Sequence, residues 1–252
     1  MMNKISNYYW MYSKHSIESA ILNPHRKVLN FLIEEKFLKY YKDFFFKQKI
    51  KKKIKIEVVS KFNIKKKIGN LAKYQGLALK VEKLQIKQNT IVEKDIKKEK
   101  LILIIDQLND PNNLGALFRI AYAYAIKNIL ILDRFMPEEN GYIASVASGA
   151  LDKINIIKVP NLVNMIRLLK KNNWWVVGLE SKKFENCINL YEQNFYLQKK
   201  ALVIGSESKG IRNLVRRNCD ILCRIPIIND DLDSINVVQA ASIALYEFNR
   251  KK

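Results

Sequence analysis

Residues able to bind an anion follow a short apolar run at Leu101–Ile105. Asp110, Asn113 and Arg119 come after it, in a stretch dense in turn formers, and apolar periodicity then resumes as in a helix. The guanidinium of Arg119 can grip a phosphate with a fork of donors and stabilise developing negative charge. Strand, polar loop and helix in this order are typical of binding sites in open α/β sheets. The alternative is an ordinary turn followed by a surface arginine.

A second stretch, Gly205-Ser206-Glu207-Ser208-Lys209-Gly210, lies between an apolar run and a predicted helix. Two glycines let main chain approach a ligand closely. A nucleotide triphosphate loop is excluded because Gly210 is followed by Ile211-Arg212 rather than Lys-Ser/Thr. Glu207 is either a site residue or a carboxylate favoured by the positive end of a helix dipole.

A third stretch, Ser234-Ile235-Asn236-Val237, opens the last predicted helix, of which Ser234 is the predicted N-cap. It follows an apolar strand, Ile221–Ile225, that ends in an Ile-Pro turn at Ile225-Pro226. Polar residues thus follow three predicted strands at their carboxyl ends.

In this order the three stretches resemble the three motifs of the SpoU (TrmH-type) branch of the SPOUT RNA methyltransferases. The resemblance covers nearly the whole chain and is closest to the 23S rRNA guanosine-2'-O-methyltransferases. It implies transfer of a methyl group from S-adenosylmethionine (SAM) to a ribose 2'-hydroxyl, without a metal. By position, the implied catalytic residues are Asn113, Arg119, Glu207 and Asn236. The implied SAM contacts, mostly through main chain, are Gly205, Ile225 and Ile235.

Two features depart from the family pattern, both at the expected wall of the SAM pocket. Ile235 replaces the usual leucine, and the acidic segment 227–233 is one residue longer than is common. We expect these changes to affect the affinity for SAM rather than to abolish binding.

The C-terminal part alternates strand and helix patterns, which predicts a mostly parallel sheet with helices on both faces. Periodicity alone predicts an ordinary doubly wound α/β fold, because chains rarely thread loops. A deep trefoil knot and a homodimer are what the resemblance implies. The predicted division is residues 1–92 as a small α/β domain, 93–100 as a charged linker, and 101–252 as the knotted methyltransferase domain. The resemblance identifies the first as an L30e-like domain that binds the RNA substrate.

The formal net charge is +21, and it is concentrated at the N-terminal end. Residues 1–100 hold 25 Lys/Arg against 9 Asp/Glu. This asymmetry favours a polyanionic partner, although lysine enrichment throughout a chain from an AT-rich genome would produce some of it. The predicted phosphate contacts, which serve RNA without reading sequence, are Lys51, Lys52, Lys53, Lys65 and Lys66.

Compartment signals favour the cytoplasm. The three cysteines (Cys187, Cys219, Cys223) fit neither a disulfide framework nor a zinc motif. The N-terminus has no apolar signal segment, and no run approaches the ~18 apolar residues of a membrane span.

Two readings rival the methylation of 23S rRNA. Sister enzymes that act on tRNA share all three motifs. A catalytically silent RNA-binding or ribosome-assembly protein would use the same scaffold without chemistry. Retention of all four catalytic candidates disfavours a silent scaffold. A dinucleotide-binding dehydrogenase is excluded, since no GxGxxG follows a strand.

Overall fold

The computed structural model describes residues 7–69, 74–85, 87–88, 99–132, 134, 136–181, 184, 187–193, 195, 199–206, 209–229 and 231–250. The chain forms two compact units. Unit 1 comprises Met1–Gln85 and Glu138–Lys153, and unit 2 comprises Ile86–Pro137 and Ile154–Lys252. This division differs from the expected one, because Glu138–Lys153 belongs with the N-terminal unit. Most of the expected linker, residues 93–98, lies outside the described residues.

Unit 2 is built on a sheet of eight described strands, in the order β10-β12-β9-β11-β6-β7-β8-β5. Every neighbouring pair among them is parallel. The strands are β5 Lys87–Gln88, β6 Leu101–Ile105, β7 Asn128–Leu132, β8 Asn155–Val159, β9 Trp175–Leu179, β10 Cys187–Asn189, β11 Lys200–Ile204 and β12 Ile221–Arg224. The predicted parallel sheet is confirmed, and the knot stays a prediction.

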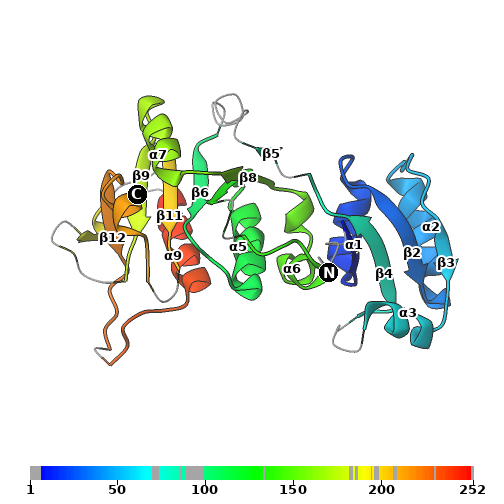
Figure 1. Ribbon diagram of the computed structural model, residues 1–252. Helices are drawn as coiled ribbons and strands as arrows, with labels where there is room; N and C mark the ends of the chain where they lie inside the picture. Colours follow the sequence, from blue (N-terminus) through cyan, green and yellow to red (C-terminus); the bar gives the residue numbers. More distant parts are fainter. Residues whose placement is uncertain are drawn as a thin grey trace, which may run out of the picture. The chain divides into compact units, whose positions relative to one another are not determined.

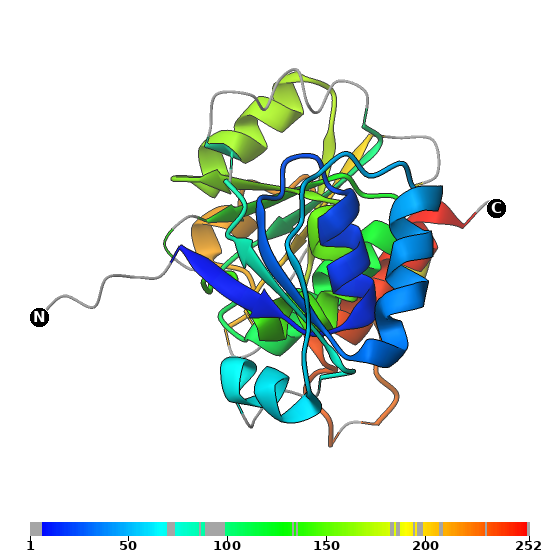
Figure 2. The same ribbon diagram turned by 90° about the vertical axis from the view of Figure 1, so that its right-hand side faces the viewer.

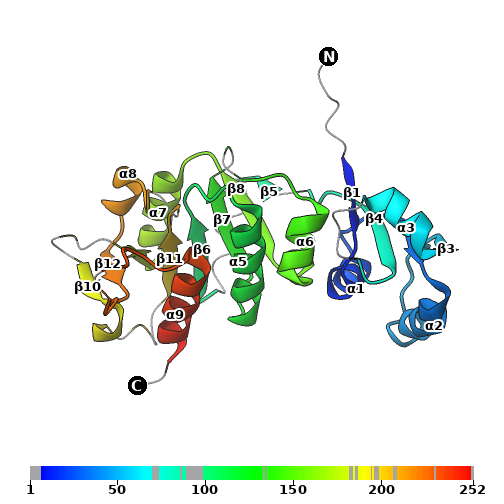
Figure 3. The same ribbon diagram turned by 90° about the horizontal axis from the view of Figure 1, so that it is seen from below.

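Helices cover both faces of this sheet (Figure 3). The helices of unit 2 are α5 Pro111–Ala123, α7 Leu162–Lys171, α8 Asn213–Arg216 and α9 Val237–Asn249. Ile102 and Ile104 of β6 pack with α7 and α8 in one apolar core, so the intervening residues face the side of α5 and α9. Leu101–Ile105 is buried throughout, as expected for a parallel strand covered on both faces.

Unit 1 holds a four-stranded sheet in the order β1-β4-β2-β3. Its elements are β1 Tyr8–Met11, α1 Lys14–Leu22, β2 Val28–Ile33, α2 Leu38–Lys47, β3 Ile56–Val58, α3 Lys61–Ile68, β4 Leu77–Glu82 and α6 Gly141–Ala147 (Figure 1). Helices α1 and α2 lie side by side on one face (Figure 2). There the ring of Phe31 meets Tyr41 edge-on, while Leu32 points to the opposite face and packs with Ile64 of α3. Helix α3 was missed by the sequence analysis.

Segment Glu138–Lys153 joins unit 1 through buried polar contacts. The fully buried guanidinium of Arg26 pairs with Glu139 and, through Nε at 2.8 Å, with Asp152. Ser16 Oγ donates to the carbonyl of Ala144 at 2.6 Å. A Cβ on Gly149 would lie 2.4 Å from Ser19 Oγ, so the small-residue segment 147–151 packs closely against α1. These contacts explain why the segment groups with unit 1.

No helix in the described part of the chain is both long and apolar enough to cross a membrane.

Candidate cofactor pocket and active site

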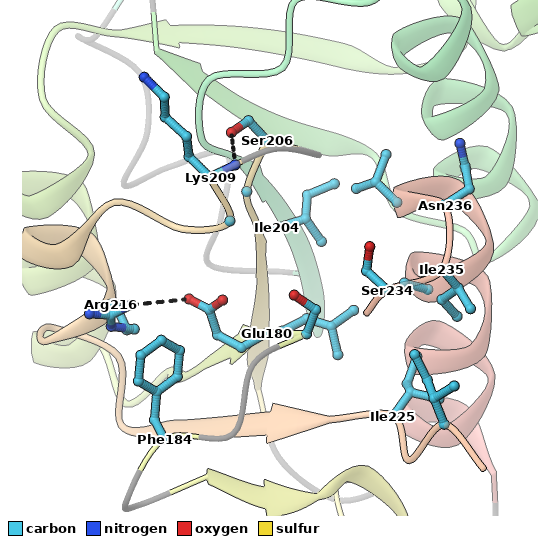
Figure 4. Close-up of a pocket in the computed structure, with 17 residues that line it drawn as sticks. Glu180, Phe184, Ile204, Ser206, Lys209, Arg216, Ile225, Ser234, Ile235 and Asn236 are labelled. Atoms are coloured by element: carbon cyan, nitrogen blue, oxygen red, sulfur yellow. Dashed lines mark hydrogen bonds and ion pairs between the residues drawn. The ribbon is translucent and has the colours of Figure 1, made fainter. Parts of the chain in front are cut away.

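A cavity of about 510 Å³ opens in unit 2 where three neighbouring strands, β12, β9 and β11, end. Its walls come from the segments that follow these strands and from the first turn of α9 (Figure 4). Ligands of open α/β sheets bind at the carboxyl ends of strands, and the volume lies within the ~300–1,000 Å³ of small-molecule sites.

The loop after β11 forms one wall of this pocket. Ser206 and Gly210 exchange two main-chain hydrogen bonds, N to O, at 3.2 and 2.9 Å, which close the loop on itself. A Cβ on Gly205 would lie 2.0 Å from the carbonyl carbon of Gly210, so only glycine permits this closure. Gly210 has φ +65, the left-handed region that favours glycine. Glu207, the predicted catalytic residue of this loop, lies outside the described residues.

A buried carboxylate braces the far end of the same loop. Asp106, fully buried just after β6, accepts hydrogen bonds from the main-chain N of Arg212 at 3.0 Å and from its Nε at 2.7 Å. The main-chain N of Asp106 in turn donates to the carbonyl of Ile204 at 2.8 Å. The loop is therefore held at both ends by polar contacts with β6 and β11.

The third predicted stretch forms the opposite wall. Ile235 and Asn236 line the pocket, together with Ile225 and Gly205, so all three predicted SAM contacts lie in one cavity. The predicted N-cap was wrong: Asn236, not Ser234, caps α9, and its Oδ1 accepts from the main-chain N of Val238 at 2.8 Å. The helix thus begins two residues later than a serine cap would place it.

Two predicted catalytic residues from distant stretches meet beside the pocket. Asn236 Nδ2 donates to Oδ1 of Asn113 at 3.2 Å. Asn113 is buried in the first turn of α5, which Asp110 caps by accepting from the main-chain N of Asn112 and Asn113. The contact joins the first motif to the third: Asn236 lines the cavity (Figure 4), and Asn113 is hydrogen-bonded to it.

Arg119 is not brought to the cavity within one chain. It is exposed on α5 and does not line the pocket. Six positions along a helix correspond to a rise of about 9 Å and a rotation of about 240°, so Arg119 and Asn113 lie on different faces of α5.

Sequence reasoning missed a charged end of the pocket formed by Glu180, Phe184 and Arg216 (Figure 4). The side chain of Glu180 is only 4% exposed, and Nη1 of Arg216 lies 4.0 Å from its Oε1. The guanidinium of Arg216 stacks over the ring of Phe184 at 3.9 Å, and its Nη2 donates to Asn213 Oδ1 at 3.1 Å. The only sequence signal was the position of Glu180 immediately after a buried strand, β9.

The predicted RNA-binding lysines of unit 1 fall into two groups. Lys51, Lys53, Lys65 and Lys66 are exposed. The ammonium of Lys52 instead donates to the main-chain carbonyls of Asn23 and of Arg26, the latter at 3.0 Å, near the end of α1. Burial lowers its pKa. We therefore remove Lys52 from the proposed phosphate contacts.

Neither the cysteines nor acidic clusters suggest another kind of site. Burial raises the pKa of Cys219 and of Cys223 to about 12, so both thiols are inert packing groups. The described residues include no group of three or more His, Cys, Asp or Glu side chains that would hold a metal ion.

The pocket suits SAM in size and in chemistry. Isoleucine side chains offer an apolar surface for a flat adenosyl group, and the glycine-lined loop offers main-chain hydrogen-bonding groups. A buried carboxylate and a guanidinium are present for charged groups. These residues would hold the cofactor, which supplies the activated methyl group.

The chain is similar in sequence to known methyltransferases. A protein of Staphylococcus aureus (strain COL), named as a TrmH family tRNA/rRNA methyltransferase, is 32% identical over 95% of this chain and 94% of its own length. The 23S rRNA (guanosine-2'-O-)-methyltransferase RlmB of Xylella fastidiosa (strain 9a5c) is 33% identical over 73% of this chain and 74% of its own length.

Solved structures share the fold. The SpoU methyltransferase AviRb from Streptomyces viridochromogenes, in complex with AdoMet, matches with a TM-score of 0.76 at 17% identity, over 96% of this chain and 89% of that one. An AdoMet-bound rRNA methyltransferase from Sinorhizobium meliloti matches with the same TM-score at 18% identity, over 96% and 87%. The model of the SpoU rRNA Methylase family matches residues 100–246, and the chain belongs to that family of methyltransferases.

Proposed function

We propose that this RNA methyltransferase transfers the methyl group of SAM to the 2'-hydroxyl of a guanosine in 23S rRNA. The observation that carries the proposal is the cavity at the ends of β12, β9 and β11, which residues of the second and third motifs line together and where Asn236 contacts Asn113 of the first motif at 3.2 Å. Similarity to a relative named as a 23S rRNA guanosine-2'-O-methyltransferase supports this choice of substrate.

The side chains of this protein have two kinds of role: some orient the ribose hydroxyl, and one neutralises the charge of a substrate phosphate. Asn113 and Asn236 can orient the ribose hydroxyl, since an amide both donates and accepts hydrogen bonds. Arg119 would neutralise a neighbouring phosphate, and Glu207 would position the loop after β11. The guanidinium of Arg119 is not itself the base, because an arginine side chain carries only hydrogen-bond donors and has no acceptor for a proton. A substrate phosphate is the group next to it that can accept a proton.

A homodimer would supply what one chain lacks. Arg119 lies on an exposed face of α5, away from the pocket of its own chain. Helices α5 and α9 pack together, and both leave large apolar side chains exposed, at Tyr122, Ile243 and Tyr246. A second copy that covers these helices would allow Arg119 of one protomer to approach the pocket of the other.

Unit 1 is proposed to bind the RNA, as an L30e-like domain would. Four lysines are exposed and would contact RNA phosphates without reading the base sequence: Lys51, Lys53, Lys65 and Lys66. An RNA-modifying role supports our proposal that the protein acts in the cytoplasm.

The test is transfer of labelled methyl from SAM to unmodified 23S rRNA and, separately, to unmodified tRNA, followed by mapping of the modified ribose. Labelling of a guanosine in rRNA is the expected result. Labelling of tRNA alone would replace the proposed substrate, a choice that the name of the S. aureus relative leaves open. SAM binding without any labelling, on RNA naked or within assembling subunits, would favour a silent RNA-binding protein.

The variant Arg119→Ala separates chemistry from cofactor binding. We expect it to abolish methyl transfer and to leave the dissociation constant for SAM largely unchanged, because Arg119 does not line the pocket of its own chain. Loss of SAM binding in a folded variant would contradict this division of roles.

A further inference from the structure

We propose that Glu180 and Arg216 recognise the amino-acid tail of the cofactor, with the carboxylate of Glu180 binding its α-ammonium and Arg216 its α-carboxylate. The inference rests on the proposed function, because it names residues of the same SAM pocket. Neither residue belongs to the three motifs that indicated the site.

The polarity of the pocket is divided between its two sides. Glu180 and Arg216 lie on the side away from Ile235 and Asn236 (Figure 4). Ile225 and Ile235 supply the apolar side. SAM is divided in the same way, since its adenosyl part is flat and uncharged while its tail is a zwitterion. Because a buried charge needs a charged or hydrogen-bonding partner, the adenosyl part should lie against the isoleucines and the zwitterionic tail against the charged side.

The two charged groups match a zwitterion in sign and spacing. Arg216 Nη1 lies 4.0 Å from Glu180 Oε1, which is too long for a hydrogen bond. Between these two atoms the interaction is electrostatic attraction without a shared hydrogen. The hydroxyl groups of ribose could donate hydrogen bonds to the carboxylate of Glu180, but they carry no negative charge that would pair with Arg216. An ammonium and a carboxylate on one carbon satisfy both.

Both groups are held in place before a ligand arrives. The main-chain N of Glu180 donates to the carbonyl of Cys223 at 2.9 Å, which fixes the start of its loop against β12. Arg216 is stacked on Phe184 and bonded to Asn213, so its fork keeps one orientation. Preorganised groups lose little entropy on binding, which raises their contribution to affinity. Lys209 also lines the pocket, but it is exposed and its charge is screened by water.

The full-length protein and its variant Glu180→Gln test the assignment through binding alone. The probes are S-adenosylhomocysteine (SAH), 5'-methylthioadenosine, which lacks the amino-acid tail, and an SAH analogue that lacks only the α-amino group. Their dissociation constants are measured by isothermal titration calorimetry. Hydrogen bonds to charged groups contribute about 1.5–3 kcal/mol, so Glu180→Gln should weaken SAH binding about 10- to 100-fold. Binding of the two ligands without an ammonium should stay within about twofold, since both lack the group recognised.

Arg216→Gln provides the complementary variant, and Glu247→Gln the matched control. We expect Arg216→Gln to weaken SAH and to spare 5'-methylthioadenosine. Glu247 is a carboxylate of unit 2 that does not line the pocket, so its substitution should change nothing. Retained binding of 5'-methylthioadenosine also proves that each variant keeps a folded pocket. If Glu180→Gln fails to fold, Arg216→Gln decides the question.

Other outcomes would overturn the inference in distinguishable ways. Equal weakening of SAH and 5'-methylthioadenosine would place Glu180 against the adenosyl part. Unchanged SAH binding in both variants would show that neither residue contacts the cofactor. If the unaltered protein binds neither ligand nor SAM, the cofactor assignment itself fails, and not only the role of Glu180.

Discussion

Replacing Asp106 with asparagine should loosen the loop from Gly205 to Arg212 and weaken cofactor binding. The buried carboxylate accepts two hydrogen bonds from Arg212, from the main-chain N at 3.0 Å and from Nε at 2.7 Å. An asparagine has one acceptor oxygen, so its NH₂ group would face one of these donors. Losing a charge-assisted hydrogen bond costs about 1.5–3 kcal/mol. We expect the lower half of that range, because the Arg212 side chain is 33% exposed and can turn to water.

Calorimetric titration with SAH measures the consequence at the pocket. If about 1.4 kcal/mol of the cost falls on the loop, the dissociation constant rises about tenfold. Arg212→Gln should have a smaller effect, since the main-chain N–H of residue 212 still reaches Asp106. The double variant should weaken binding by less than the sum of the two, because the variants remove the same contact. Reduced thermal stability with unchanged SAH affinity in Asp106→Asn would refute the reasoning, since Asp106 would then support the sheet and not the loop.

Three further predictions follow from buried and exposed charges. Arg26→Met should destabilise unit 1 by about 3–5 kcal/mol in urea unfolding, since it leaves two buried carboxylates without their cation; an unchanged midpoint would contradict this. Burial lowers the pKa of Lys200 to about 8 from an ordinary 10.5. Between pH 8 and pH 10.5 the unfolded chain therefore keeps a proton on this lysine that the folded chain has lost, and the free energy of unfolding rises with pH. In Lys200→Met that rise should be smaller by up to about 3 kcal/mol, as pH-dependent unfolding would reveal. Replacing Lys51 and Lys53 with glutamine should lower the slope of log affinity for RNA against log salt by about 1.4–1.8, whereas Lys52→Gln should leave the slope unchanged.

Sequence patterns predicted the parallel sheet well because its strands are buried on both faces. A run such as Leu101–Ile105 then has no polar residues to blur its ends, and its bounds were predicted to the residue. The pocket residues Gly205, Ile225 and Ile235 were also predicted, because the resemblance to the SpoU family identifies their positions within the motifs.

Features that depend on three-dimensional neighbours were not predictable in the same way. Lys52 looks like Lys51 and Lys53 in sequence, yet only its ammonium meets main-chain carbonyls near the end of α1. Glu180 acquires its importance from the order β12-β9-β11, which places its loop between two others. No periodicity in the chain reports that order.

The structure also changes which residue distinguishes an enzyme from a silent scaffold. Asn236 caps α9, and Asn113 accepts its amide, so both residues have structural reasons to be present. Their retention therefore argues less strongly for catalysis than their sequence positions alone suggested. Arg119 is exposed and, among the residues that the structure describes, caps no helix and lines no wall of the pocket, so folding gives no comparable reason for it. A variant at Arg119 that keeps stability and SAM affinity but loses methyl transfer would thus establish the chemistry, whereas the same loss at Asn236 would be open to a purely structural explanation.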